Sequence, residues 1–326
     1  MLKKIVNEAH LTLRITTTGP LLIKSGRATV SGPDMTPVLT FRNGKQEVFI
    51  PGSSLKGVFR SHIEKVICSL KPRVACYPFS SNEDKEADIE LRRRDYAESC
   101  SAKFTGAGHS NDTTEQVYSQ SCPVCRLFGS TGFIGRVAIG DAYVVTEQTK
   151  EQRDGVGIDR LTGGASNGAK FELEVVSTGV AFETDIHLRN FEVWQLGMLF
   201  VVLQDLEDEL IRIGSGRSRG LGKVKAELSG ASGGIITSAI RDSGEPANEL
   251  WGLGRWLNDD SYGTRKDDLL ALANPVASSH HGIRGMRTFT GDALKFVSDA
   301  STERFIERIQ QWPAQPASQA APTRGR

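Results

Sequence analysis

All five cysteines of this 326-residue chain lie between Cys68 and Cys125, in a stretch without a regular pattern of apolar residues. Residues 69–121 show neither the 3.6-residue period of a helix nor the alternation of a strand. A loop of that length is unusual inside a compact domain unless something holds it together. Clustered cysteines in a cytosolic chain indicate metal or redox chemistry. The cysteines therefore predict an insertion held together by its own side chains.

Cys122 and Cys125 form a Cys-x-x-Cys motif, the spacing that lets two thiolates bind one tetrahedral zinc ion. A redox-active pair is expected where a strand runs into a helix, whereas "RLFG" follows this motif. We therefore predict a structural Zn²⁺ site whose ligands are Cys76, Cys100, Cys122 and Cys125. Cys68 is expected on the buried side of a helix, and His109 is an alternative ligand.

The overall charge is close to balance. The formal net charge is +1, so any nucleic-acid site must come from a local group of basic residues. Hydrophobic residues make up 38% of the chain and charged residues 24%, as in ordinary globular proteins. No apolar run is long enough to cross a bilayer, and the first residues, "MLKKIVNEAHLTLRI", lack the pattern of a signal peptide. We expect a cytoplasmic protein without a membrane partner.

The periodic segments predict the order strand, helix, strands, helix, strand. Residues 10–16 alternate polar and apolar side chains, and residues 52–70 carry an apolar stripe at helical spacing. Residues 191–213 form a second long apolar segment, which we expect to be helical. Residues 170–176 and 180–188 are predicted to pair as a hairpin. This order is typical of an α+β fold of the ferredoxin-like type.

The character of the chain changes after Leu228, where "SGASGG" is typical of a linker. We predict a domain over residues 1–228 with an insertion at 69–130. Residues 229–326 form a C-terminal extension, and its last stretch, "PAQPASQAAPTRGR", is predicted to be disordered by composition.

Two basic motifs are suited to phosphate. The loop "GSGRSRGLG" at 214–222 interleaves glycines, which let a backbone approach a ligand, with Arg217 and Arg219, which bind phosphate bidentately. It is neither a Walker loop nor a dinucleotide fingerprint, since no GK[ST] ending and no helix follow. A flexible turn is the alternative. The helix at 52–70 is predicted to begin with Ser53 or Ser54 as its N-cap, and its N–H groups attract anions.

Four blocks, taken in order, resemble the signature blocks of the RAMP superfamily, in particular the backbone subunit of type III CRISPR effector complexes. They are "IPGSSLKGVFRSHIEKV", "CRLFGS…GRVAIGDAYV", "GIDRLTGGASNGAKFELEVV" and "GSGRSRGLGKV", and the resemblance spans residues 8–228. It implies an RRM-like ferredoxin fold with a β-hairpin thumb at about 150–175. Such subunits stack along a CRISPR RNA, beside adjacent backbone subunits and other subunits of the complex, and a complementary target RNA pairs with the guide.

The resemblance also implies site residues. Guide-RNA contacts are expected from the helix start, the thumb and the glycine-rich loop, namely from Ser53, Ser54, Lys56, Arg60, Arg160, Gly214, Gly216, Arg217, Ser218 and Arg219. Asp34 in "GPDMTPV" matches the catalytic aspartate of cleaving members, although two residues rather than one separate it from Pro37. It would bind Mg²⁺ or orient the attacking ribose 2′-hydroxyl. A turn-forming aspartate is the alternative.

Three functions remain open at this point. The first is an RNA-guided, metal-dependent endoribonuclease subunit, and the second is a non-catalytic filament subunit that only binds guide RNA. The third is an endoribonuclease that processes CRISPR RNA with a histidine base, for which His10 and His62 are candidates. The cysteine insertion and a thumb expected to be compact favour a filament role.

Overall fold

Strand β1 (Asn7–Thr17) lies at the centre of the main sheet. The computed structural model describes residues 4–26, 32–77, 95–105, 112–230, 233–241 and 244–314. On one side β1 pairs antiparallel with β10 (Ala181–Arg189). On the other side it pairs first with β12 (Ile235–Ile240) and then, further along, with β11 (Val224–Ser229). One strand thus joins elements from both ends of the chain.

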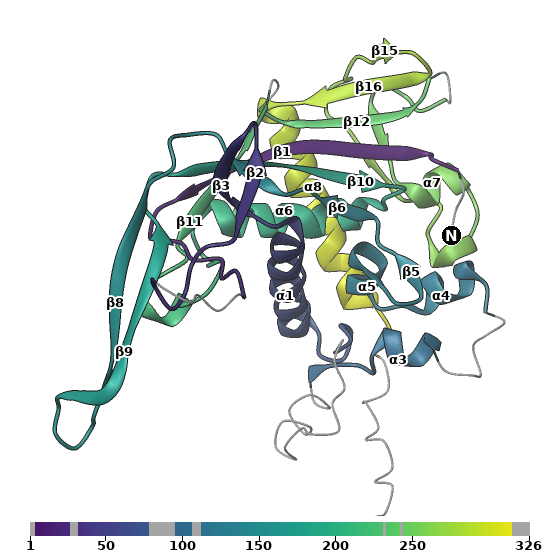
Figure 1. Cartoon of the computed structure of the whole chain (residues 1–326). Helices are drawn as coiled ribbons and strands as arrows, with labels where there is room; N and C mark the ends of the chain where they lie inside the picture. Colours follow the sequence, from purple (N-terminus) through teal and green to yellow (C-terminus); the bar gives the residue numbers. More distant parts are fainter. Residues whose placement is uncertain are drawn as a thin grey trace, which may run out of the picture.

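Ten strands of the described residues form this antiparallel sheet, in the order β15-β16-β12-β1-β10-β7-β3-β2, with β11 beside β1 and β6 beside β10 (Figure 1). The remaining strands are β2 (Leu39–Arg42), β3 (Lys45–Ile50), β6 (Val137–Ile139), β7 (Ala142–Val144), β15 (Ser279–His281) and β16 (Arg284–Phe289). The inner order β11-β1-β10-β6, with a helix after β1 and another after β10, is the ferredoxin-like arrangement. The predicted α+β class is confirmed.

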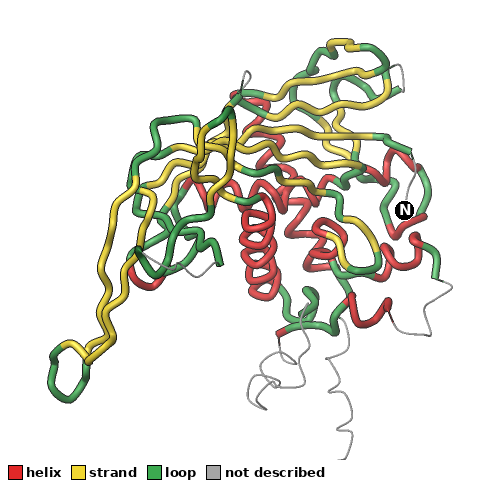
Figure 2. Tube along the Cα trace, viewed as in Figure 1, coloured by secondary structure: helices red, strands yellow, loops and turns green. Residues whose placement is uncertain are grey.

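Three helices cover one face of the sheet: α1 (Gly52–Leu70), α6 (Val193–Glu207) and α8 (Gly291–Gln311) (Figures 1 and 2). The side chains of Leu11, Leu13 and Ile15 on β1 are buried on this face, while His10, just before them, is exposed. Helix α6 is almost entirely apolar because it is packed between the sheet and α8. The other face of the sheet is polar.

The start of α1 differs from the prediction. Pro51 precedes the first helical residue, and no side chain of the N-cap closes the helix. The N–H of Gly52 instead donates to Oδ1 of Asp141, 2.8 Å away, so a carboxylate from the β6–β7 turn caps the helix. A Cβ at Gly52 would overlap the carbonyl of Ile139. The prediction of a serine N-cap was wrong, because this turn packs directly on the helix end.

The hairpin after residue 149 also differs. Strands β8 (Lys150–Ile158) and β9 (Ala165–Val176) form a two-stranded sheet of their own, which projects from the body (Figure 1). The predicted pairing of 170–176 with 180–188 is wrong, because β10 is already paired with β1, β6 and β7. With nine and twelve residues in its strands, the hairpin is long rather than compact.

The segment after Leu228 shares the core of the preceding residues. Strands β12 and β16 widen the main sheet, and α8 packs against α6. Phe289, Phe305 and Ile309 belong to the same hydrophobic cluster as Leu13. The smaller elements here are β13 (Glu249–Trp251), α7 (Leu253–Leu257), the 3₁₀ turn η3 (Ser261–Gly263) and β14 (Leu269–Ala271). Residues 315–326, predicted to be disordered, lie outside the described residues.

The insertion contains short elements that rest on the C-terminal segment. They are α3 (Cys100–Thr105), α4 (Thr114–Gln120), α5 (Pro123–Phe128), β4 (Gly129–Ser130) and β5 (Phe133–Ile134). The guanidinium of Arg126 on α5 donates to the carbonyl of Gly263 and lies 4.6 Å from the ring centroid of Trp312. Nζ of Lys71 donates to the carbonyls of Gln310 and Trp312, each at 2.8 Å. The two parts therefore stabilise each other.

We expect Gly197→Ala to lower the free energy of unfolding by about 1–3 kcal/mol, as overpacking of a core usually does. A Cβ at Gly197 on α6 would overlap the carbonyl oxygen of Ser301 on α8, so the helices would have to separate. Gly57→Ala is the matched control, since nothing lies within 4 Å of its added Cβ and a helical alanine is favoured. Denaturant unfolding measures the free energy of unfolding of both variants. Equal stabilities would contradict the close helix contact.

Candidate functional site

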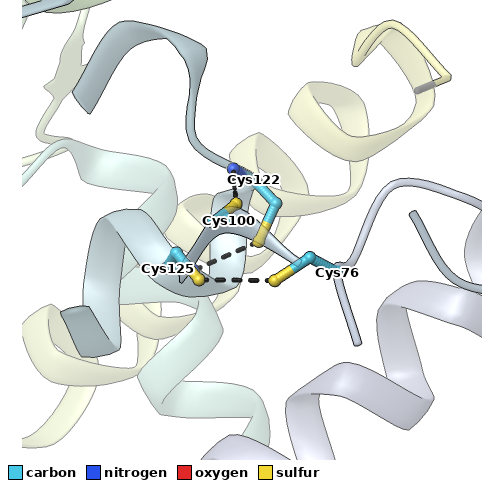
Figure 3. A group of neighbouring side chains, drawn as sticks. All are labelled: Cys76, Cys100, Cys122 and Cys125. Carbon is cyan, nitrogen blue, oxygen red and sulfur yellow. Dashed lines mark hydrogen bonds between the residues drawn. The ribbon is translucent and has the colours of Figure 1, made fainter. Parts of the chain in front are cut away.

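The four cysteines predicted as ligands come together in a buried group (Figure 3). Their sulfur atoms all lie within 4.8 Å of one another, and the Sγ atoms of Cys76 and Cys125 are 3.5 Å apart. None is in a disulfide. A tetrahedral zinc site with Zn–S bonds of about 2.3 Å needs sulfurs about 3.8 Å apart, which this group can adopt with little movement. The four cysteines can therefore hold a metal such as zinc.

N–H groups surround these sulfurs. The backbone N–H of Cys122 donates to Sγ of Cys100 at 3.3 Å, and the N–H of Cys125 donates to Sγ of Cys122 at 3.4 Å. The second bond arises because Cys122 is the N-cap of α5, so the Cys-x-x-Cys spacing places one sulfur at the first turn of a helix. Donors of this kind stabilise thiolates.

Arg60 contributes a third donor to the cysteine group. Its Nη2 lies 3.3 Å from Sγ of Cys125, its Nη1 donates to the carbonyl of Gly129, and its Nε donates to Glu64. Only 22% of the side chain is exposed. Arg60 was predicted to contact RNA, but its guanidinium is turned toward the cysteines. Sequence spacing shows that Arg60 is off the apolar stripe, and it does not show what lies beside it.

The two other candidate ligands lie elsewhere or cannot be placed. Cys68 is half-buried on α1, where its Sγ lies 3.4 Å from the carbonyl oxygen of Asp95, and burial raises the pKa of its thiol to about 11. His109 lies outside the described residues. The group that the structure brings together is therefore the predicted set of four cysteines.

A second place of interest is a cavity of about 210 Å³ beside the first turns of α1. Its lining includes Ser54 from the helix, Gly214 and Ser215 from the glycine-rich loop, and Lys24 from the segment after β1. Two predicted motifs, about 160 residues apart in the sequence, thus meet across one hollow. Lys24 was not predicted as a site residue. The signal that could have identified it is its place as a basic residue within a Gly/Ser-rich loop. Lys56 is not among the lining residues: it is half-buried, and its Nζ donates to the carbonyl of Val137 on β6 at 3.4 Å.

The glycines of the loop are required by its backbone. Gly214 has φ +76° and Gly222 has φ +82°, and a Cβ at either would overlap a backbone carbonyl, that of Leu22 or Ile213. The N–H of Ser215 donates to the carbonyl of Leu22 at 2.8 Å, which fixes the loop against the segment after β1. Between these anchors the 3₁₀ turn η2 (Arg217–Arg219) presents exposed side chains. The loop is therefore a basic turn whose two ends are fixed against neighbouring backbone.

Asp34 lies on the base of the hairpin. Its Oδ2 accepts the backbone N–H of Glu172 on β9 at 2.8 Å, and its side chain is otherwise exposed. The next residue, Met35, packs in a small hydrophobic cluster with Leu22, Val175 and Leu221. This cluster joins four segments: the loop after β1, the Asp34 segment, the hairpin base and the glycine-rich loop. It therefore brings Asp34 near the other predicted site segments.

The sequence profile of the RAMP superfamily matches residues 14–225, from β1 through the glycine-rich loop to β11. The chain is a member of the RAMP superfamily. The match includes the cavity, the cysteine group and the hairpin, and membership indicates a CRISPR-associated RNA-binding subunit. No curated protein matches the chain. Among the described residues, no helix of this RAMP protein is long and apolar enough to cross a membrane.

The hairpin tip of this RAMP protein is exposed and partly apolar. Leu161 is 97% exposed and Ile158 is 58% exposed, with Arg160 between them also at the surface. Oδ1 of Asp159 accepts the N–H groups of Leu161 and Thr162, so Asp159 shapes the turn. These two bonds give the Asp159 side chain a capping role in the turn.

The histidines lie away from the cavity. His10 stacks on His187 on the polar face of the sheet, with ring centroids 3.8 Å apart, and burial lowers the pKa of His187 to about 4. Glu8 accepts from His187 and pairs with Arg189 and Arg284, so arginines already offset its charge. His62 contacts Asp205 on α6. None of the three lines the cavity.

We expect the purified protein to carry one bound metal ion per chain at the four-cysteine group. Cys122→Ser should lose most of this metal and lower the unfolding temperature, because three sulfurs bind a divalent ion much less tightly. Cys68→Ser is the matched control, since that thiol lies outside the group. Elemental analysis and thermal unfolding measure both effects. A metal-free wild type, prepared without chelators, would contradict the expectation.

Proposed function

We propose that this RAMP protein is a CRISPR RNA-binding backbone subunit of a type III effector complex and cleaves target RNA paired with the guide. The observation that carries the proposal is the meeting of the α1 start, the glycine-rich loop, the Asp34 segment and the hairpin base at one place. Guide RNA, complementary target RNA, adjacent copies of the subunit and other subunits of the complex are the partners that follow.

Backbone recognition would come from the cavity and from η2. Ser54 and Lys24 line the hollow, and Arg217 and Arg219 are exposed beside it. Guanidinium groups bind phosphate bidentately, and a braced loop loses little conformational entropy when it binds. Asp141, which caps α1, offsets part of the positive field of the helix end. We therefore assign most of the phosphate attraction to the basic side chains.

The hairpin would act as the thumb. Its projecting tip carries Ile158, Arg160 and Leu161, which are suited to insertion beside a base and to contact with the RNA backbone. Splaying one nucleotide out of the stack would orient its 2′-hydroxyl toward the adjacent phosphate. The ring of Phe171 on β9 lies 5.4 Å from the guanidinium of Arg219, which couples the hairpin to the glycine-rich loop.

Asp34 is the proposed catalytic residue. One carboxylate oxygen is held by the N–H of Glu172, and the exposed side chain leaves the other available to a metal ion or to the 2′-hydroxyl. Among the described residues Asp34 belongs to no group of three potential ligands, so it fits Mg²⁺ only as a single carboxylate, with phosphate and water completing the shell. A bound divalent ion would neutralise charge on the scissile phosphate.

For the four-cysteine group we propose zinc in a structural role. Four buried sulfurs, with no open position for substrate among the described residues, are typical of structural zinc.

A non-catalytic filament subunit remains the alternative function, in which Asp34 serves only to hold the hairpin base through Glu172.

We expect Asp34→Asn to abolish cleavage of a guide-paired target RNA, by at least about 100-fold, while target binding is unchanged. Asparagine can still accept the N–H of Glu172, so this variant keeps the turn and removes only the charge. The measurement is a gel assay on the reconstituted complex with labelled RNA and Mg²⁺. Asp34→Ala, which removes both the charge and the bond from the N–H of Glu172, is run alongside. Full cleavage by Asp34→Asn would leave the aspartate as a turn residue and favour the non-catalytic alternative.

We expect Arg217→Ala with Arg219→Ala to weaken guide binding and to reduce the slope of log K against log salt by about 1.4, since each lost phosphate contact on single-stranded RNA is worth about 0.7. Lys65→Ala with Arg304→Ala, which removes two exposed charges on other helix faces, is the matched control. Binding is measured by filter retention at several salt concentrations. An unchanged slope would contradict a phosphate-binding loop.

A further inference from the structure

Arg60 connects the cysteine group to the helix that borders the cavity. It lies in the third turn of α1, six residues after Ser54, which is about 9 Å along the helix axis. One end of a rigid element therefore lines the candidate RNA site, and its middle contacts the candidate metal site. The predicted roles treat these sites as independent, whereas the structure joins them through one side chain.

The guanidinium is fixed by three different partners. Nε donates to Oε1 of Glu64 at 2.9 Å, Nη1 donates to the carbonyl of Gly129 at 3.0 Å, and Nη2 faces Sγ of Cys125 at 3.3 Å. Glu64 is itself only 12% exposed, so it orients the guanidinium without bringing it to solvent. Gly129 is the C-cap of α5, the helix that carries Cys125. Arg60 thus holds the middle and the C-terminal end of that helix against α1.

The positive charge of Arg60 makes its contact with Cys125 more favourable when the cysteine group holds a metal ion. A divalent ion bound by four thiolates leaves a net negative charge in a buried place, which is costly unless a cation or N–H donors offset it. Backbone N–H groups serve the sulfurs of Cys100 and Cys122. For Cys125 the donor is the guanidinium of Arg60, which brings a full positive charge as well. Partners outside the ligand shell commonly change metal affinity by about 10–100-fold.

We propose that Arg60 is a positioning residue that stabilises the metal-loaded cysteine group and, through α1, makes guide-RNA affinity depend on metal loading. The second half rests on the proposed RNA-binding function. A loaded group would hold Arg60, and with it the α1 start beside the glycine-rich loop. Loss of the metal would weaken the charge attraction between Arg60 and the cysteine group, and with it the support that Arg60 gives to the helix that lines the cavity.

The first experiment measures metal alone, on the full chain without RNA. Zinc affinity is determined by chelator competition, and Co²⁺ substitution reports the thiolate-to-metal charge-transfer band. We expect Arg60→Gln to bind zinc about 10–100-fold more weakly and to shift this band, because the positive donor at Cys125 is lost. Arg60→Lys keeps the positive charge but loses the planar guanidinium with its several N–H donors, so its zinc affinity should lie between those of the wild type and Arg60→Gln.

Lys65→Gln is the control, since it removes the same charge from an exposed position on the same helix. Arg60→Gln with the affinity and band of Lys65→Gln would overturn the proposal. If Arg60→Gln does not fold, Arg60→Lys carries the test, and an affinity and band equal to those of the wild type would then overturn it.

The second experiment measures guide-RNA affinity at low and at saturating zinc. We expect the wild type and Lys65→Gln to bind RNA more tightly at saturating than at low zinc, and Arg60→Gln to show little dependence on zinc, because the contact that links the cysteines to α1 is lost. A zinc dependence of Arg60→Gln as large as that of the wild type, or RNA binding by the wild type that does not change with zinc, would overturn the coupling. A wild type that binds no guide RNA would contradict the proposed function instead, and the chelator experiment would still decide the role of Arg60 at the cysteines.

Discussion

The pairing of β1 on both sides is the constraint on which the molecule depends. Its partner β10 leads into α6, and its partners β11 and β12 connect the family core to the C-terminal segment. Residues Leu11, Leu13 and Ile15 face the helices, so a one-residue slip in the register would expose them and bury polar neighbours. The cavity is also a product of this pairing, because the loops that line it leave the ends of β1 and precede β11.

A second set of contacts ties the insertion to the body. Arg126, next to Cys125 of the cysteine group, is 3% exposed and lies between the rings of Tyr118 and Trp312. On the other side of the group, Arg60 joins Cys125 to α1. The cysteines are therefore held between an N-terminal helix and the end of the C-terminal helix. This arrangement explains how the described parts of an insertion without periodicity pack around the four sulfurs.

Local signals in the sequence predicted much of this. The apolar stripe of α1 and the alternation in β1 predicted the elements, because burial on one face imposes those periods. The Cys-x-x-Cys motif predicted two members of the cysteine group, because the spacing itself brings two sulfurs together. Partners far apart in the sequence could not be predicted. Nothing in the sequence shows that Asp141 caps α1, that Arg60 turns toward Cys125, or that β9 pairs with β8 rather than β10.

The separate two-stranded sheet of β8 and β9 has a consequence for how this protein can change over evolutionary time. Among the described residues its base contacts the body through Leu173 and Val175, with Glu172 bonded to Asp34 and Phe171 beside Arg219, so residues added to both strands beyond that point leave the main sheet undisturbed. Because side chains alternate along a strand, additions of two residues per strand preserve which side faces the body and extend the reach by about 6.6 Å. The hairpin can therefore lengthen in discrete steps, each set by the two-residue repeat of a β-strand.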